Sequence, residues 1–245
     1  MTAAPGFPDL AGKAVLVTGG ATGIGAALVA GFAAQGARAA FLDVDRVAGE
    51  ALAGRTGARF IPCDVTDVAA LQDAVRGCGP LDVLVNNAAR DDRHAFAHVT
   101  PERWRALLAV NLDHHVFATQ AAAPAMPPGA SVILMGSVSW VRGRPGLVAY
   151  TTAKAGIHGL VRTLARELGP AGIRVNGLVP GAILTERQRA LWRTPDEDRA
   201  FLERQAIPVL LDAQHLVGPA LFLASEASAG MTGTEIRVDA GLTLG

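Results

Sequence analysis

The stretch that decides the fold is Ala14-Val-Leu-Val-Thr-Gly-Gly-Ala-Thr-Gly-Ile-Gly25. Lys13–Thr18 is short, apolar and β-branched, which indicates a strand buried on both faces. Glycines follow at once, and from Gly23 to Gln35 apolar residues recur at helical spacing until Gly36. A strand, a glycine-rich turn and a helix in this order are typical of a dinucleotide-binding unit.

Strand and helix alternate along the rest of the chain. We expect strands at Ala37–Asp43, Ala58–Cys63, Leu81–Val85, Ser131–Met135, Ile173–Leu178 and Glu235–Val238. Helices are expected at 45–56, at Asp67–Cys78, from Thr100 to about Ala125, and at Thr151–Leu168, Arg199–Gln205 and Ala213–Ala224. Since no linker interrupts this order, residues 1–245 are predicted to form one α/β domain with a mainly parallel sheet.

One polar segment, Glu186 to Arg204, breaks the alternation. It follows the end of a predicted strand and contains Trp192 and Pro195. Ligands of such folds bind outside the carboxyl ends of the strands. We therefore expect a loop or helical insertion over that edge, forming a substrate flap at about 184–206.

The composition excludes several classes of protein. Half of the 245 residues are hydrophobic and 18% are charged, so the chain is not disordered. Lys and Arg together number 22, as do Asp and Glu. This balance argues against a protein that binds nucleic acid or a membrane surface, because such proteins usually carry a basic excess.

Cysteine usage and the N-terminus bear on location. Cys63 and Cys78 lack companions at metal-ligand spacing, so we expect two reduced thiols and no metal site. Residues 1–12 hold neither the basic start nor the apolar core of a signal peptide. No apolar run approaches the ~20 residues of a membrane helix. The expectation is a soluble cytoplasmic protein.

The glycine-rich turn predicts a nucleotide site. Gly19, Gly23 and Gly25 would let the backbone turn tightly beside a pyrophosphate, and the following helix offers free N–H groups. The alternative is a glycine-rich turn without a ligand. Asp43, at the end of the second strand, favours NAD because its carboxylate would accept from the ribose hydroxyls and repel a 2′-phosphate. Arg46 is the feature that speaks for NADP.

A second group of residues suggests alcohol oxidation. Tyr150 and Lys154 are four residues apart, hence on one face of a helix. A phenol with a pKa of ~10 becomes a base when nearby positive charges favour the phenolate. Ser137 could hold the substrate oxygen, and Asn111 could position a water that carries the proton away. Taken alone, the pair could be an ordinary amphipathic one.

At this point the chain resembles the short-chain dehydrogenase/reductase family. The matching pieces are residues 18–25, Asp64-Val65, Asn86-Asn87-Ala88-Ala89, Asn111, Ser137, Tyr150 with Lys154, Pro180-Gly181, Thr232-Gly233 and Val238-Asp239. The resemblance implies a Rossmann-type doubly wound parallel sheet of seven strands, usually in a homotetramer. It also implies catalytic roles for Asn111, Ser137, Tyr150 and Lys154.

The same resemblance assigns the nucleotide site. The residues expected to contact the cofactor are Gly19, Thr22, Gly23, Ile24, Gly25, Asp43, Asp64, Val65, Asn86, Ala88, Tyr150, Lys154, Pro180, Gly181, Ile183 and Thr185. Among them, Asp64 and Val65 are expected to hold the adenine. Ile183 and Thr185 are expected to meet the nicotinamide carboxamide.

Two segments differ from a generic member and bear on the substrate. Residues 90–94 form the first, and residues 136–140 with 185–189 and Trp192 form the second. Together they bring charged, amide and indole groups to the mouth of the site. A sugar suits this mixture of hydrogen-bonding groups and aromatic faces. The candidate substrate residues are Arg90, Ser137, Ser139, Trp140, Gln188 and Trp192, although each could belong to a solvated loop.

These segments resemble those of bacterial aldose 1-dehydrogenases, which oxidise xylose, arabinose or galactose to lactones. The leading hypothesis is therefore an NAD-dependent oxidation of an aldose at its anomeric carbon. A 3-oxoacyl or other ketone reductase is the alternative enzyme, and it predicts NADPH and a basic docking patch. A non-catalytic NAD-binding regulator is the third possibility, and it predicts the loss of a catalytic residue.

Overall fold

A computed structural model describes residues 6–244. Within them, seven parallel strands form one sheet in the order β3-β2-β1-β4-β5-β6-β7. The strands are β1 Ala14–Thr18, β2 Arg38–Asp43, β3 Arg59–Pro62, β4 Val83–Asn86, β5 Ser131–Met135, β6 Arg174–Pro180 and β7 Glu235–Val238. The strand order reverses between β1 and β4, which confirms the doubly wound Rossmann-type sheet and marks where ligands bind in such folds.

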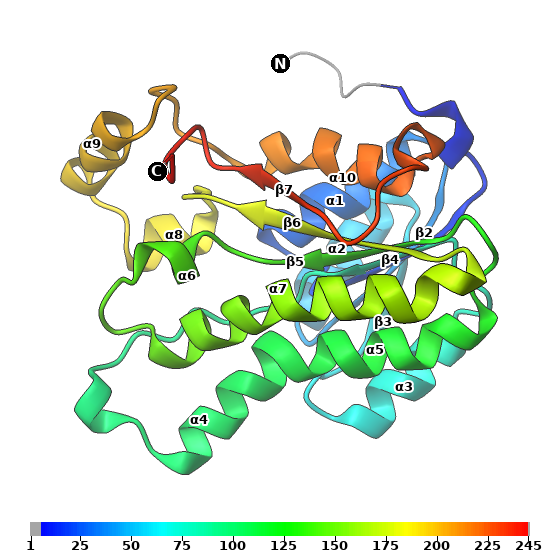
Figure 1. The fold of residues 1–245 in the computed structure, drawn as a ribbon, viewed down its shortest axis with the longest axis horizontal. Coiled ribbons are helices and arrows are strands. Elements are labelled where there is room, and N and C mark those ends of the chain that lie inside the picture. Colours follow the sequence, from blue (N-terminus) through cyan, green and yellow to red (C-terminus); the bar gives the residue numbers. More distant parts are fainter. Residues whose placement is uncertain (1–5, 245) are drawn as a thin grey trace.

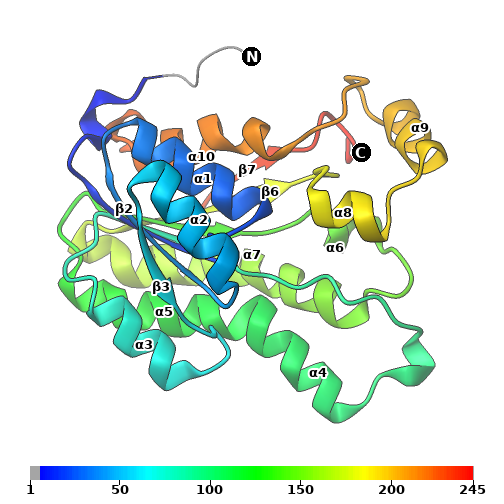
Figure 2. The same ribbon diagram turned by 180° about the vertical axis from the view of Figure 1, so that it is seen from behind.

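Helices cover both faces of the sheet (Figures 1 and 2). One face carries α1 Gly23–Ala34, α2 Arg46–Thr56 and α10 Val217–Ala224, and the other carries α3 Val68–Arg76, α4 Pro101–Leu108, α5 His114–Ala122 and α7 Val148–Leu168. Short 3-10 helices lie at Pro8–Leu10, Phe96–His98, Ala123–Ala125, Gly169–Ala171, Ala213–Leu216 and Glu226–Ser228. Among the helices of residues 6–244, none combines the length and apolar character needed to span a bilayer.

The core consists of two apolar layers, one on each face of the sheet. Val15 and Val17 pack into the layer under α1 and α10, while Leu16 packs into the layer against α5 and α7. All five residues of β1 are buried. This double burial explains why the strand is a continuous apolar run without polar alternation.

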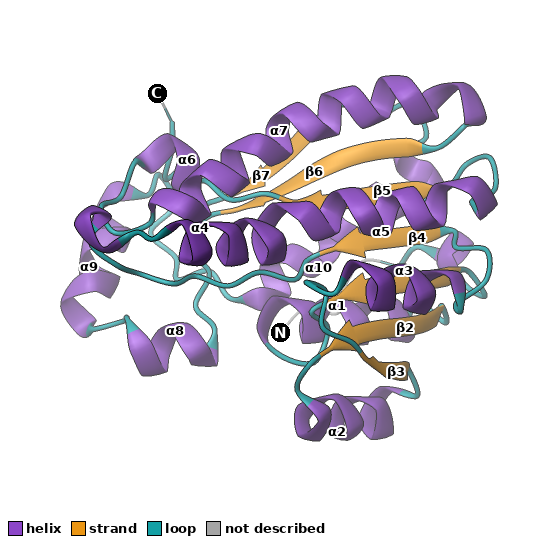
Figure 3. Cartoon of the chain, turned by 90° about the horizontal axis from the view of Figure 1, so that it is seen from below, coloured by secondary structure: helices purple, strands orange, loops and turns teal. Residues whose placement is uncertain are grey.

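Three small helices gather beyond the carboxyl ends of the strands: α6 Ser139–Arg142, α8 Glu186–Leu191 and α9 Pro195–Arg204 (Figure 3). The segment expected as a loop or helical insertion is thus helical. The Thr185 and Thr194 side chains accept from Gln188 N and Glu197 N, both at 3.2 Å, and so cap α8 and α9. Helix α6 was not expected from the sequence.

The segment predicted as one helix from Thr100 to about Ala125 is helical, with a turn in its middle that was not predicted. A π-helical turn, Ala109–Asp113, separates α4 from α5. It contains Asn111, whose Nδ2 donates to Leu107 O at 2.9 Å and to Arg90 O at 3.1 Å. The second of these acceptors lies outside the helix, so helical periodicity alone gives no sign of the turn. Such turns often occur at functional sites.

Candidate active site

Two neighbouring cavities open at the carboxyl ends of the strands. The glycine-loop cavity, of about 650 Å³, lies between the β1–α1 turn and the ends of β2, β3 and β4. The tyrosine cavity, of about 250 Å³, lies between β5, α7 and the segment 184–206. Ile24, Asn87 and Thr185 line both, so the cavities adjoin.

The glycine-loop cavity depends on two close backbone approaches. A Cβ on Gly25 would lie 1.9 Å from Gly19 O, and a Cβ on Gly19 would lie 2.7 Å from Ala88 Cα. Gly19 also has a φ of 64°, which favours glycine. The side chain of Asn87 ties the turn to β4, because its Nδ2 donates to Thr18 O at 3.0 Å and to Gly19 O at 2.9 Å. Asn87 was not among the predicted site residues.

The N-terminus of α1 faces this cavity. Thr22 is the N-cap residue, yet its side chain makes no capping hydrogen bond, and Thr22, Ile24 and Gly25 line the cavity. Uncapped N–H groups and the positive end of the helix dipole suit a phosphate. The residues present therefore fit the pyrophosphate of a dinucleotide.

Asp43 stands at the end of β2 with its carboxylate held in place. Oδ2 accepts from Ala21 N at 2.9 Å and Oδ1 accepts from Asp45 N at 3.0 Å. Asp43 lines the glycine-loop cavity, whereas Arg46 does not. The fixed negative charge thus lies at the glycine-loop cavity, where the lining cations are Arg90 and Arg187.

The other predicted cofactor residues divide between the two cavities. Asp64, Val65 and Ala88 line the glycine-loop cavity, and Pro180, Gly181 and Ile183 line the tyrosine cavity. The structure places Asn86 in neither. Asn86 is the last residue of β4, and its buried side chain donates through Nδ2 to Thr119 Oγ1 at 3.2 Å.

Tyr150 and Lys154 lie one turn apart on α7 and both line the tyrosine cavity. The Lys154 Nζ lies 5.8 Å from the Tyr150 ring centroid and donates to Met135 O at 2.8 Å. Burial lowers the pKa of Lys154 to about 7. Burial also raises the pKa of Tyr150 to about 12, against the opposing effect of the Ser137 hydroxyl.

These pKa values refine the expectation that Lys154 would make the phenol a base. In the protein chain alone, burial outweighs the neighbouring groups, and Tyr150 keeps its proton at neutral pH. Its conversion to a phenolate requires further positive charge in the cavity. An oxidised nicotinamide ring would supply such a charge.

Ser137 and Asn111 reach the site in different ways. Ser137 follows β5, lines the tyrosine cavity and accepts from Ser139 N at 3.1 Å. Asn111 lines neither cavity, and its Oδ1 accepts from Arg90 N at 2.9 Å. Since both its amide oxygen and its amide nitrogen hold backbone groups, Asn111 fixes the segment after β4. Its predicted role in positioning a water stays a prediction.

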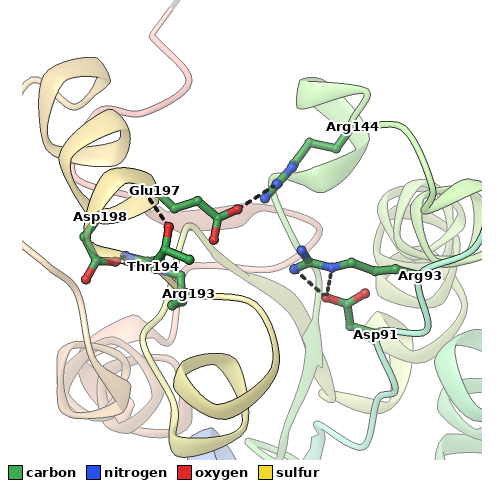
Figure 4. A network of polar contacts seen from close by, with 7 residues as sticks. All are labelled: Asp91, Arg93, Arg144, Arg193, Thr194, Glu197 and Asp198. Carbon is green, nitrogen blue, oxygen red and sulfur yellow. Dashed lines mark hydrogen bonds and ion pairs between the residues drawn. The ribbon is translucent and has the colours of Figure 1, made fainter.

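The outer wall of the tyrosine cavity is built from charged and aromatic side chains of three segments. Figure 4 shows charged side chains of this wall. Arg93 contacts Asp91 Oδ2 through Nε at 3.2 Å and Nη2 at 3.1 Å, and its guanidinium lies 4.2 Å from the Trp192 ring centroid. In the same wall, Arg144 Nη2 lies 3.5 Å from Glu197 Oε1. Segments distant in sequence thus close one wall through their side chains.

Four polar atoms of this lining have no hydrogen-bond partner within the described residues. They are Asp91 Oδ1, Ser139 Oγ, Trp192 Nε1 and Glu197 Oε2, and all four are inaccessible to solvent. Buried polar atoms in proteins nearly always have a partner. The side chains that carry these atoms line the tyrosine cavity, so its lining combines two carboxylates, an indole and a hydroxyl.

The predicted substrate residues are only partly brought together. Ser137, Ser139, Gln188 and Trp192 line the tyrosine cavity, whereas Arg90 lines the glycine-loop cavity. Trp140 lines neither, because its indole packs against the His158 ring at 4.6 Å. The wall residues not predicted as substrate contacts are Asp91, Arg93, Arg142, Arg144, Arg187, Arg193, Glu197 and Phe201. The Thr194-Pro195 helix start was the one sequence signal for those on α9.

The chain is similar to known proteins over nearly its whole length. Residues 19–243 match the family model described as enoyl-(acyl carrier protein) reductase. A protein of Rhizobium meliloti named probable galactose dehydrogenase is 48% identical over 248 residues, covering 96% of this chain and 97% of the relative. D-xylose 1-dehydrogenase of Caulobacter vibrioides is 44% identical over 242 residues, with the same coverage of 96% and 97%.

Solved structures share the fold. The crystal structure of BdcA in complex with NADPH has a TM-score of 0.89 to this chain at 33% sequence identity, over 95% of this chain and 94% of that one. A nicotinamide dinucleotide is thus bound by a close structural neighbour of this chain.

Proposed function

The chain belongs to the short-chain dehydrogenase/reductase family and is an oxidoreductase acting on CH–OH groups, and we propose that its substrate is an aldose, oxidised at the anomeric carbon to a lactone with NAD. The observation that carries the proposal is the polar lining of the tyrosine cavity, which combines the carboxylates of Asp91 and Glu197, the Ser139 hydroxyl and the Trp192 indole. Carboxylate oxygens accept from sugar hydroxyls, and the indole N–H donates to a sugar oxygen. The names of the two curated relatives agree with this substrate class.

The chemistry follows from the residues that line the tyrosine cavity. A bound nicotinamide cofactor would supply the acceptor for the hydride from the anomeric carbon. The Tyr150 phenolate removes the proton of the anomeric hydroxyl, so the carbon–oxygen bond becomes the carbonyl of a lactone. Ser137 donates to the same oxygen and holds it beside the phenol. Lys154, anchored on Met135 O, supports the phenolate.

The choice of NAD rests on Asp43. Its carboxylate is fixed by two backbone N–H groups and lines the glycine-loop cavity. A 2′-phosphate at that position would meet like charge, whereas ribose hydroxyls would donate to the carboxylate. Because the structurally similar BdcA binds NADPH, the preference for NAD over NADP is tested by comparing the two cofactors in the assay below.

Three further parts of the proposal come from the family resemblance and the segment's position. We propose a homotetramer, a cytoplasmic location, and movement of the segment 184–206 as a flap over the tyrosine cavity. Light scattering after size-exclusion chromatography tests the first. A monomer of the catalytically active protein would refute the tetramer.

One assay separates this function from its alternatives. Reduction of NAD⁺ is followed at 340 nm with aldoses, cyclic alcohols and hydroxyacyl esters, and each is repeated with NADP⁺. We expect turnover with at least one aldose, faster with NAD⁺. Turnover confined to hydroxyacyl esters would favour the ketone reductase, and no turnover with any alcohol would favour the regulator. Faster reaction with NADP⁺ would refute the role of Asp43.

A further inference from the structure

A third cavity, of about 500 Å³, lies between α6 and α9 beside the tyrosine cavity. Its lining consists of Arg142, Gly143, Arg144, Pro145, Glu197, Ala200, Phe201, Arg204 and Leu242. Four of these residues also line the tyrosine cavity: Arg142, Arg144, Glu197 and Phe201. We call this space the arginine cavity. A ligand that reaches Tyr150 could extend into it.

The charges around the arginine cavity do not balance. Three arginines line it against a single carboxylate, that of Glu197, which lies 3.5 Å from Arg144. The neighbouring Arg193 is paired with Asp198 (Figure 4). Within residues 6–244, neither Arg142 nor Arg204 forms an ion pair or a side-chain hydrogen bond with another protein group. Two guanidiniums at this cavity therefore lack an anionic partner in the described chain.

Arg142 is the more informative of the two, because it is half-buried. Its guanidinium lies 4.8 Å from the ring centroid of Phe201, which is buried and is covered by Arg193 at 4.5 Å. Burial lowers the pKa of Arg142, and the charges of Arg144, Arg204 and Arg193 act in the same direction. An exposed arginine is compensated by water, but a half-buried one among like charges is not fully compensated.

An anion would relieve this imbalance. Guanidinium groups bind carboxylates and phosphates through paired N–H donors, and partial burial strengthens such contacts. We propose that the arginine cavity binds a carboxylate or phosphate group, carried by the sugar at the end remote from its anomeric carbon. The assignment to a sugar rests on the proposed function, whereas the assignment of an anion site does not.

The anion site is tested first without turnover. Inorganic phosphate is titrated by calorimetry into the protein saturated with NADH, for the wild type, Arg204→Gln and Arg199→Gln. Arg204 lines the arginine cavity but not the tyrosine cavity. Arg199 lies on the same helix, is exposed and lines neither cavity. We expect phosphate affinity to fall about tenfold in Arg204→Gln and to be unchanged in Arg199→Gln. Equal affinity in all three proteins would overturn the site.

The source of the anion is tested by kinetics with D-galactose, D-galacturonate and D-galactose 6-phosphate. We expect kcat/KM for a charged sugar to exceed that for galactose by at least about tenfold, mainly through KM. The ratio of charged to neutral kcat/KM should fall toward one in Arg204→Gln and stay constant in Arg199→Gln.

The two experiments fail separately. Phosphate binding without any preference for charged sugars would show that the anion is a free ligand and would refute its assignment to the sugar. If no sugar of either kind is oxidised, the proposed function is wrong, but the calorimetry still decides whether the arginine cavity binds an anion.

Discussion

The glycine-loop cavity and the outer wall of the tyrosine cavity are built in opposite ways. The first is held by contacts to the backbone, such as those of Asn87 with Thr18 O and Gly19 O. The second is held by side chains that contact other side chains, as in the contact between Arg144 and Glu197. The first arrangement tolerates almost no change of backbone shape. The second can be rebuilt by substitution without moving the sheet.

The first prediction concerns Tyr150, whose loss should affect the chemical step but not the binding of the cofactor. Tyr150→Phe removes the proton-accepting oxygen while leaving a ring of the same shape on α7. Because general acid–base catalysis contributes about 10²–10⁴-fold, we expect kcat to fall by about 10³-fold. NADH binding, measured by fluorescence titration, should be unchanged. Retention of more than a tenth of the wild-type kcat would show that another group removes the proton.

The second prediction breaks the cavity held by the backbone. In Gly25→Ala the new Cβ would lie 1.9 Å from Gly19 O, so the turn must shift. An overpacked site of this kind costs roughly 1–3 kcal/mol, which corresponds to about a tenfold to hundredfold loss of NADH affinity. Gly54→Ala on α2 is the matched control, since nothing lies within 4 Å of its Cβ. It should stabilise the helix by ~0.5–1 kcal/mol and leave NADH binding unchanged.

The same contrast explains how far the sequence predicts the structure. β5 and β7 have the predicted boundaries. β5 is fully buried, and its short apolar run shows this directly. The segment expected as one helix from Thr100 to about Ala125 is helical throughout, but its π turn was not predicted. Asn111 in that turn donates to Arg90 O, 21 residues away. Local periodicity carries no information on that contact.

Within the site, the positions of the glycine turn and Asp43 were predictable because each lies directly at the end of a predicted strand. The wall residues were less so. Trp140 was expected at the substrate but lies against His158, because α6 directs the indole away from the cavity. Glu197 was missed, since Thr194-Pro195 marks the start of α9 but not the face that turns inward. Side-chain contacts between distant segments require the assembled fold.

A third prediction concerns Lys154, which contacts a carbonyl but pairs with no carboxylate in residues 6–244. Its pKa falls from 10.5 to about 7 on folding. Between these values the unfolded chain holds one more proton than the folded chain, so stability rises with pH. The slope is about 1.4 kcal/mol per pH unit in that range and vanishes below it. Urea unfolding of the cofactor-free protein at pH 7.5 and 8.5 measures the slope.

The control for this slope is Lys154→Met, which has no titrating group at that position. The wild-type free energy of unfolding should rise relative to that of the variant by about 1.4 kcal/mol over the pH unit. Burial raises the pKa of the Cys63 and Cys78 thiols, but both proteins contain these thiols, so their contribution cancels in the comparison. Parallel behaviour of the two proteins would mean that Lys154 stays protonated in the folded state.

The smallest effect is expected in the wall made of side chains. Trp192→Phe keeps an aromatic ring against Arg93 but removes the unpartnered Nε1 donor. A neutral hydrogen bond contributes about 0.5–1.5 kcal/mol, so KM for the aldose should rise by about twofold to tenfold, with kcat and KM for NAD⁺ unchanged. Trp104→Phe on α4, outside all three cavities, should alter neither constant. A fall in kcat for Trp192→Phe would instead show that the indole orients the reacting carbon. The wall would then tolerate substitution as poorly as the glycine turn does.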